Sequence, residues 1–411
     1  MAFVLGAGSG AFAGGQLFNI FCGRFSDDSM SLYGRRRPFI FICAGILFIA
    51  FSLLWAGFSL GWPVCFMMSY FLIGLGIFAI NTLAFSLLND QLGTHQIGMA
   101  GGIAALLDVC SLVITTILVL VLVSDDATPY FCYVLCLIIA CCIPYLFITE
   151  VPLTTPQVSA SILDKAYRIF TDPSERDFLK SLCVEVFNGF QFASKPYAMA
   201  GLKDVMHVRD PADRIFFMNT GLLVTFGVAL PMTIVLGKFI GESMQRVKLS
   251  IWAVAITNAM GIAVVLLMIS PFVNDTEETN NVQKVLWYVS CVFNGVAYGF
   301  WTTVGGVLYM ATLSNQHETA MSKTFRAPFA GAGGLIGSLV YGVLIMPWFK
   351  NDDSSITFNG FLVTFGVAMV ACIFMGVSGQ LVRRTSFRTS AEDDESVVDE
   401  NNHLSWDLGI V

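Results

Sequence analysis

The stretch that decides the fold reads Gly23-Arg24-Phe25-Ser26-Asp27-Asp28-Ser29-Met30-Ser31-Leu32-Tyr33-Gly34-Arg35-Arg36-Arg37-Pro38-Phe39-Ile40. It is a short polar interval between two long apolar runs, at 1–22 and 38–60. Gly23 and Gly34 permit tight turns, and Pro38 suits the first turn of a following helix. The interval therefore predicts a short hairpin between two membrane helices.

The charged residues of this hairpin suggest a specific structure. Asp27 can accept hydrogen bonds from the N-termini of helices. Arg35, Arg36 and Arg37 can bind carboxylates, backbone carbonyls or lipid phosphates. A plain positively charged anchor needs neither the glycines nor the aspartate, so these residues indicate a more specific role than anchoring.

The composition of the whole chain indicates the environment in which it folds. Of 411 residues, 56% are hydrophobic and only 12% are charged, with a mean hydropathy of +0.73. A soluble domain cannot hide so much apolar surface in one core, so the chain is predicted to be an integral membrane protein. The net charge of −7, without a basic stripe, excludes a nucleic-acid partner. The 11 cysteines lack metal-ligand spacing, so we expect no metal site.

A spanning helix needs about 20 mostly apolar residues. Eleven such runs are present, and the first is not a signal peptide because it lacks a basic start. The predicted spans are 1–22, 38–60, 62–88, 99–123, 128–149, 178–200, 215–237, 250–272, 285–312, 325–349 and 356–382. The fold class is therefore an all-α polytopic membrane protein.

The longest break between spans divides the chain into four regions. Residues 1–149 form an N-terminal bundle of five spans, and 178–382 form a C-terminal bundle of six. The linker at 150–177 contains a capping-box pattern that starts at Ser161. Apolar residues then recur at helical spacing with Lys165 on the polar surface, which predicts an amphipathic helix on the inner membrane face. Residues 383–411 form a polar, acidic tail.

The distribution of basic residues predicts the orientation. If the 23–37 loop is cytoplasmic, 16 of the 22 Lys and Arg residues lie on the cytoplasmic side, and so does the C-terminus. The sequon at Asn274 then falls outside, where it is a candidate for glycosylation. The chain is thus a multi-pass protein of the plasma membrane or of an organelle membrane.

The 23–40 stretch resembles the loop signature of the major facilitator superfamily. More narrowly, it resembles the longer form found in plant-type sucrose/proton symporters and related glycoside–cation symporters. The tract from Gly34 to Ile40 carries the Gly-Arg-Arg-Arg-Pro-Phe-Ile of that pattern, and Asp27 occupies the position of the family aspartate. Asp28 departs from the pattern, and so does Phe85, which stands where the sucrose transporters have Arg.

The resemblance implies an architecture of two six-helix bundles in which the second and eleventh helices pack across the interface. The first span here would then be the second helix of the family. The first helix of the family would have no counterpart in this sequence, either because the sequence is truncated or because the protein is a divergent one without that helix. Glycines at every fourth position, Gly6, Gly10 and Gly14 in the first span and Gly333 and Gly337 in the tenth, provide smooth faces for this contact.

Charges within spans are costly and need a reason. Asp108 lies about 13 Å into its span at 1.5 Å per residue, too deep to reach water easily. Glu185 and Lys195 share one face of another span and lie too far apart along the axis to pair with each other. All three are candidates for cation coupling, and Lys195 is free to meet a carboxylate of the other half, such as Asp108.

A sugar site needs hydrogen-bonding groups and an aromatic surface. Asn188 and Gln191 lie beside Glu185 and Lys195 on the same helix, while residues 294, 298 and 301 share one helix face. The candidate substrate contacts are Asn81, Asn188, Gln191, Asn294, Tyr298 and Trp301. Buried polar contacts between helices would explain the same residues.

The resemblance implies a secondary active transporter that moves sucrose or a related sugar with a proton by alternating access. The hairpin would then act as the gate on the cytoplasmic side, with Gly23, Asp27, Gly34, Arg35, Arg36 and Arg37 as its residues. Its partners would be the sugar and the lipid bilayer, with no cofactor and no obligate protein partner. One alternative is a facilitator or symporter of another small organic solute. A non-transporting membrane sensor or scaffold is a second alternative. A membrane-embedded enzyme is disfavoured because no catalytic grouping of residues is found.

Overall fold

The structure is a computed structural model of the chain. It describes residues 2–91, 94–122, 128–148, 150, 161–198, 211–240, 244–273, 281–312, 319–350 and 356–383. Within these ranges the chain is helical, and its extended pairing is limited to one isolated bridge between Lys350 and Ile356. The predicted all-α class is confirmed.

The helices follow the apolar runs of the sequence. In the first half they are α1 (Ala2–Leu17), α2 (Asn19–Asp27), α3 (Arg37–Leu60), α4 (Pro63–Gln91), α5 (Thr94–Leu122) and α6 (Thr128–Phe147). The linker contains α7 (Ile162–Thr171) and η1 (Pro173–Glu175). The second half contains α8 (Arg176–Phe192), α10 (Pro211–Ile240), α11 (Met244–Met268), α12 (Asn281–Thr312), α13 (Thr319–Leu339), the π-helix η3 (Val340–Ile345), η4 (Met346–Phe349) and α14 (Phe358–Leu381).

Seven stretches of the described residues are long and apolar enough to cross a membrane. They are Arg37–Gly57, Pro63–Ala84, Phe216–Leu236, Met244–Met268, Asn281–Leu308, Phe325–Phe349 and Phe358–Leu381. Each falls on a predicted span, so the chain is a multi-pass membrane protein. Helices α1 with α2, α5, α6 and α8 occupy the four other predicted spans. The division into five and six spans stays a prediction.

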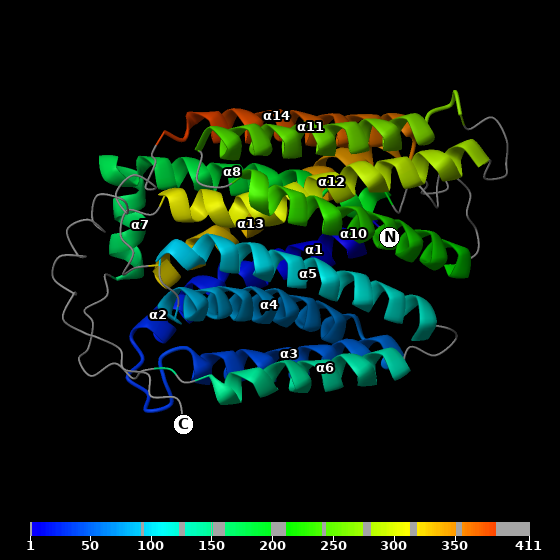
Figure 1. Cartoon of the computed structure of the whole chain (residues 1–411). Helices are drawn as coiled ribbons and strands as arrows, with labels where there is room; N and C mark the ends of the chain where they lie inside the picture. Colours follow the sequence, from blue (N-terminus) through cyan, green and yellow to red (C-terminus); the bar gives the residue numbers. More distant parts are fainter. Residues whose placement is uncertain are drawn as a thin grey trace.

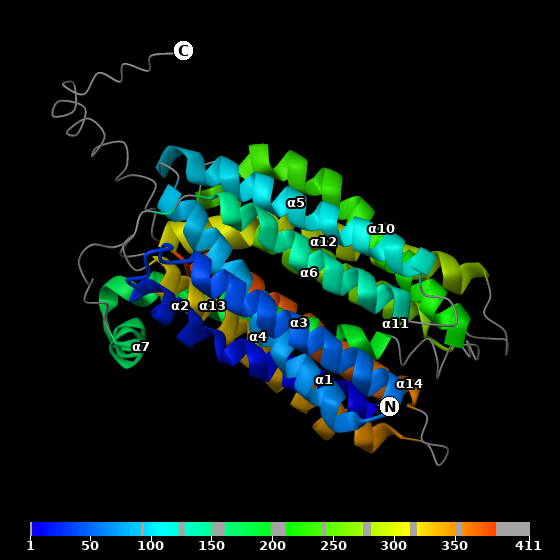
Figure 2. The ribbon, with the colours of Figure 1, turned by 90° about the horizontal axis from the view of Figure 1, so that it is seen from below.

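The helices run roughly side by side, with the first half below the second in Figure 1, and Figure 2 shows the same layers from below. In the first half, α4 packs against α1 and α3, and α6 packs against α3. In the second half, α12 packs against α10 and α11, and α14 packs against α8 and α11. The halves meet where α1 contacts α13 and where α5 contacts α10.

The predicted contact between the first and tenth spans is present, but its glycines serve another purpose. A Cβ at Gly333 or Gly337 would meet the backbone of α8, and a Cβ at Gly14 would meet Phe71 of α4. Of the predicted set, Gly10 lies opposite Leu335 of α13. The glycines therefore bring helices together mainly within each half. The expectation that they face the opposite half was wrong for Gly14, Gly333 and Gly337.

The linker helix α7 begins as the sequence predicts. Ser161 is its N-cap, and the Ser161 hydroxyl accepts a hydrogen bond from the backbone N–H of Asp164 at 3.0 Å. Lys165 was expected on the polar surface, and that was wrong. Its ammonium is buried and lies 2.8 Å from the carboxylate of Glu175. A buried lysine needs such a partner, which a helical pattern within one segment does not reveal.

Candidate functional site

Asp108 and Tyr298 connect the two halves of the molecule. Asp108 lies on α5, and Tyr298 lies on α12. The Tyr298 hydroxyl and the Asp108 carboxyl group lie close enough to interact. The ring of Phe226, on α10, packs edge-on against the ring of Tyr298 with centroids 5.6 Å apart. A candidate coupling residue and a candidate substrate contact are thus brought together between α5, α10 and α12.

Glu185 forms an ion pair deep in the second half. Its carboxylate accepts a hydrogen bond from the Nε of Arg326 on α13. The same guanidinium donates to the backbone carbonyl of Gly305 at 2.8 Å and lies 5.7 Å from the centroid of the Trp301 ring. This cluster joins α8, α12 and α13, and it neutralises a carboxylate that is almost fully buried.

The sequence missed the role of Arg326. Arg326 is one of the 16 basic residues predicted to lie on the cytoplasmic side, although it lies within an apolar run that forms α13. A cation inside such a run signals a carboxylate partner nearby, and that signal was available. Gly305 is the second residue missed here, because a Cβ at this position would collide with the guanidinium of Arg326.

Lys195 does not meet Asp108 as suggested, since no ion pair joins these two described residues. Helix α8 ends at Phe192, a turn follows, and Lys195 begins a further helical segment. The Lys195 ammonium lies 4.6 Å from the centroid of the Phe192 ring. The predicted span 178–200 is therefore interrupted between Glu185 and Lys195.

The other candidate substrate contacts are dispersed. The Gln191 side-chain amide donates a hydrogen bond to the side-chain oxygen of Asn188 at 3.1 Å, so these two candidates bind each other. Asn294 donates to the backbone carbonyl of Ser290, one turn earlier on α12. Asn81 is exposed on α4. The aromatic candidate Trp301 lies against the guanidinium of Arg326. The predicted sugar contacts are therefore spread over several separate parts of the structure.

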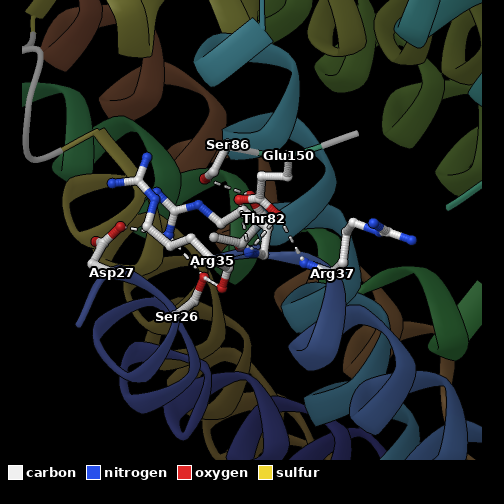
Figure 3. A network of polar contacts seen from close by, with 8 residues as sticks. Ser26, Asp27, Arg35, Arg37, Thr82, Ser86 and Glu150 are labelled. Atoms are coloured by element: carbon white, nitrogen blue, oxygen red, sulfur yellow. Dashed lines mark hydrogen bonds and ion pairs between the residues drawn. The ribbon is translucent and has the colours of Figure 1, made fainter. Parts of the chain in front are cut away.

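The hairpin between α2 and α3 is ordered by a network of polar contacts (Figure 3). Asp27 and Arg36 form an ion pair at 2.5 Å, and Arg36 donates to the Ser26 hydroxyl at 2.8 Å. The Ser26 hydroxyl donates in turn to the backbone carbonyl of Arg35 at 3.4 Å. Gly23, at the start of this stretch, is buried in α2. The polar residues predicted to form the cytoplasmic gate therefore contact one another.

Glu150 completes this network and was not predicted. Its carboxylate accepts hydrogen bonds from the backbone N–H groups of Arg36 at 2.9 Å and Arg37 at 3.2 Å, at the start of α3 (Figure 3). The Arg37 guanidinium donates to the carbonyls of Tyr145 and Leu146 at the end of α6. A carboxylate at a helix N-terminus is favourable. The acidic residue directly after a predicted span was the only signal for it.

Gly34 has the geometry that its position in a tight turn suggested. Its φ of +99° lies where side chains are disfavoured, and a Cβ there would collide with the Glu150 side chain. Asn274, the predicted glycosylation site, lies outside the described residues.

Comparison with known proteins identifies the family. Residues 1–338 match the sequence profile of the Major Facilitator Superfamily. The chain belongs to this superfamily. Its members are transporters and not enzymes, which excludes the enzyme alternative. No curated protein matches this chain.

Solved structures share the fold at low sequence identity. The nucleoside transporter NupG gives a TM-score of 0.58 at 14% identity, covering 92% of this chain and 90% of NupG. The human organic anion transporter MFSD10 (TETRAN) gives 0.61 at 11% identity, covering 90% and 83%. A variant of the E. coli fucose:proton symporter FucP gives 0.55 at 10% identity, covering 93% and 98%. Identities this low establish the major facilitator fold alone.

Proposed function

We propose that this major facilitator chain is a proton-coupled symporter of sucrose or a related sugar that works by alternating access. The observation that carries the proposal is the interaction between the Asp108 carboxyl group and the Tyr298 hydroxyl. It joins a carboxyl group within a predicted span of the first half to a hydroxyl of the second half. Alternating access requires the two halves to move against each other around a central site.

This interaction links proton binding to that movement. A carboxylate accepts a hydrogen bond more strongly than a protonated carboxyl group does. Protonation of Asp108 therefore weakens its attraction for the Tyr298 hydroxyl and changes the relative stability of arrangements in which α5 and α12 are close. A proton then shifts the population of conformations because it favours one of them, as coupling requires.

The cytoplasmic hairpin supports the same mechanism. The ion pair between Asp27 and Arg36 and the capping of α3 by Glu150 hold α2, α3 and α6 in a fixed arrangement. Helix α2 also contacts α13 of the other half. The hairpin is thus positioned to latch the two halves on the side predicted to be cytoplasmic.

The sugar is inferred from the resemblance of the hairpin to that of sucrose symporters. Trp301 supplies an aromatic surface of the kind that sugar rings stack on, and exposed Asn81 supplies hydrogen-bonding groups. The second candidate is a symporter or facilitator of another small organic solute. It is favoured by the shared fold, since two of the similar structures are described as a nucleoside transporter and an organic anion transporter.

The test is uptake into vesicles driven by a pH gradient, across a panel of sugars, nucleosides and organic acids. We expect Asp108→Asn to abolish the stimulation by the gradient while exchange at equal pH persists. Tyr298→Phe should shift the pH at which stimulation occurs. Tyr288→Phe is the matched control, because Tyr288 lies on the same helix and bonds to Thr220 within its own half at 3.1 Å.

Each outcome discriminates between the proposals. Gradient-stimulated uptake that survives in Asp108→Asn removes this residue from the coupling mechanism. Uptake of a nucleoside or organic acid in place of sugars favours the second candidate. Absence of any solute flux from a folded, reconstituted chain would contradict transport and favour a sensor or scaffold.

A further inference from the structure

Helix α7 has an orientation unlike that of the other helices. It stands at one end of the bundle, with its axis across the direction of the spanning helices in Figure 1 and nearly end-on in Figure 2. The α2–α3 hairpin lies at the same end. If the spanning helices cross the bilayer, α7 lies parallel to the membrane plane.

One face of α7 is fixed to the protein. Ile169 is fully buried in a cluster with Phe178 and Leu182 of α8 and Phe325 of α13, and Ile20 of α2 packs against this cluster. The buried ion pair between Lys165 and Glu175 holds the same face. Helix α7 is thus held against both halves, and it cannot turn about its axis without exposing an ion pair and an apolar cluster.

A second face of α7 is apolar and exposed. Leu163, Tyr167 and Phe170 are 81%, 70% and 64% exposed, and their spacing of four and three residues places them in one stripe. A third face, with Asp164, Arg168 and Thr171 at the same spacing, is polar. Three large apolar side chains exposed together on one face of a short helix indicate a binding surface.

We propose that the stripe of Leu163, Tyr167 and Phe170 inserts into the membrane leaflet on this side, the predicted cytoplasmic one. The position of the stripe beside a membrane-crossing helix supports this occupant. The Phe170 ring lies 6.5 Å from the ring of Phe329, which belongs to the membrane-crossing stretch Phe325–Phe349. Phe329 is partly buried and packs against the cluster around Ile169, so the stripe lies beside the membrane-crossing stretch near its start.

The composition of the stripe defines the kind of lipid contact. It contains no Lys or Arg, and the one arginine of this helix, Arg168, belongs to the polar face. Insertion therefore depends on burial of apolar area, and it does not depend on attraction to anionic lipids. A protein partner would compete with lipid for the same side chains, so the two occupants can be distinguished by what the stripe contacts.

The experiment replaces single residues with a photoreactive amino acid in the full chain, reconstituted in vesicles of phosphatidylcholine. The changes Tyr167→p-benzoylphenylalanine and Phe170→p-benzoylphenylalanine keep an aromatic ring, and Thr171→p-benzoylphenylalanine is the control on the exposed polar face. We expect lipid adducts, detected by mass spectrometry of the protein, to be several-fold more abundant at 167 and 170 than at 171.

Other outcomes overturn the proposal. Equal lipid labelling at all three positions would mean that the helix does not insert with a defined face. Adducts at 167 with a second copy of the chain would identify a protein interface instead. Adding phosphatidylglycerol should leave the labelling ratio unchanged, and a requirement for this anionic lipid would contradict insertion by apolar contact.

Discussion

At the scale of single residues, the ion pair between Glu185 and Arg326 is the contact whose loss we expect to be most costly. Arg326→Ala leaves the Glu185 carboxylate buried and uncompensated, which typically costs about 3–5 kcal/mol. The double change Glu185→Gln with Arg326→Gln removes both charges, so it should restore much of the loss. Thermal unfolding of the purified chain in detergent measures both effects.

The control for this prediction is a surface ion pair. Arg24 and Asp28 lie 3.4 Å apart one turn from each other, and both side chains are more than a third exposed. Arg24→Ala should cost less than about 1 kcal/mol, as exposed pairs do. If Arg24→Ala and Arg326→Ala lower the melting temperature equally, the Glu185–Arg326 pair has no special role.

A second residue-scale prediction concerns the backbone of the hairpin. Gly34→Ala places a side chain at a φ of +99° and against Glu150, so it should displace Glu150 from the start of α3. We expect a large loss of folded protein or of transport. Gly61→Ala is the matched control. Its φ is also positive, at +67°, but a Cβ there meets nothing within 4 Å. Equal behaviour of the two variants in expression and uptake would show that the Glu150 contact is unimportant.

At the scale of helices, close packing between α8 and α13 depends on individual glycines. A Cβ at Gly333 would meet the backbone of Val186, whereas a Cβ at the neighbouring Gly334 would have only ordinary contacts, at 3.8 Å or more. Alanine favours helices over glycine by roughly 1 kcal/mol. Gly334→Ala should therefore be neutral or stabilising in thermal unfolding, and Gly333→Ala should destabilise. The reverse order would contradict this packing.

The same scale shows what the sequence could predict. Apolar length alone located the spanning helices, because each span must satisfy its backbone internally. The cap at Ser161 was also predictable, since its partner Asp164 is three residues away. Interruptions were not, because the break after Phe192 and the π-turns of η3 follow from packing between helices. The partners of Arg326 and Glu150 lie more than 100 residues away, beyond the reach of local patterns.

At the scale of the whole molecule, alternating access predicts that links between the halves stop transport and links within a half do not. Gly10 of α1 lies opposite Leu335 of α13, and a Cβ at position 10 would lie 3.6 Å from the leucine side chain. Gly14 of α1 lies opposite Phe71 of α4, and a Cβ at position 14 would lie 3.7 Å from the phenylalanine ring. Cysteines at 10 and 335, joined by a short bifunctional thiol reagent, would therefore tie the halves together, and cysteines at 14 and 71 would link helices of one half.

We expect the 10–335 link to abolish solute uptake reversibly, with recovery after the link is cleaved, while the 14–71 link leaves most uptake intact. The unsubstituted chain, treated with the same reagent, measures what the 11 native cysteines contribute. Full uptake with the halves linked would contradict relative motion along the α1–α13 contact. Loss of uptake from both links alike would show that the reagent acts on the fold, because only the 10–335 pair crosses the boundary at which the two bundles must move.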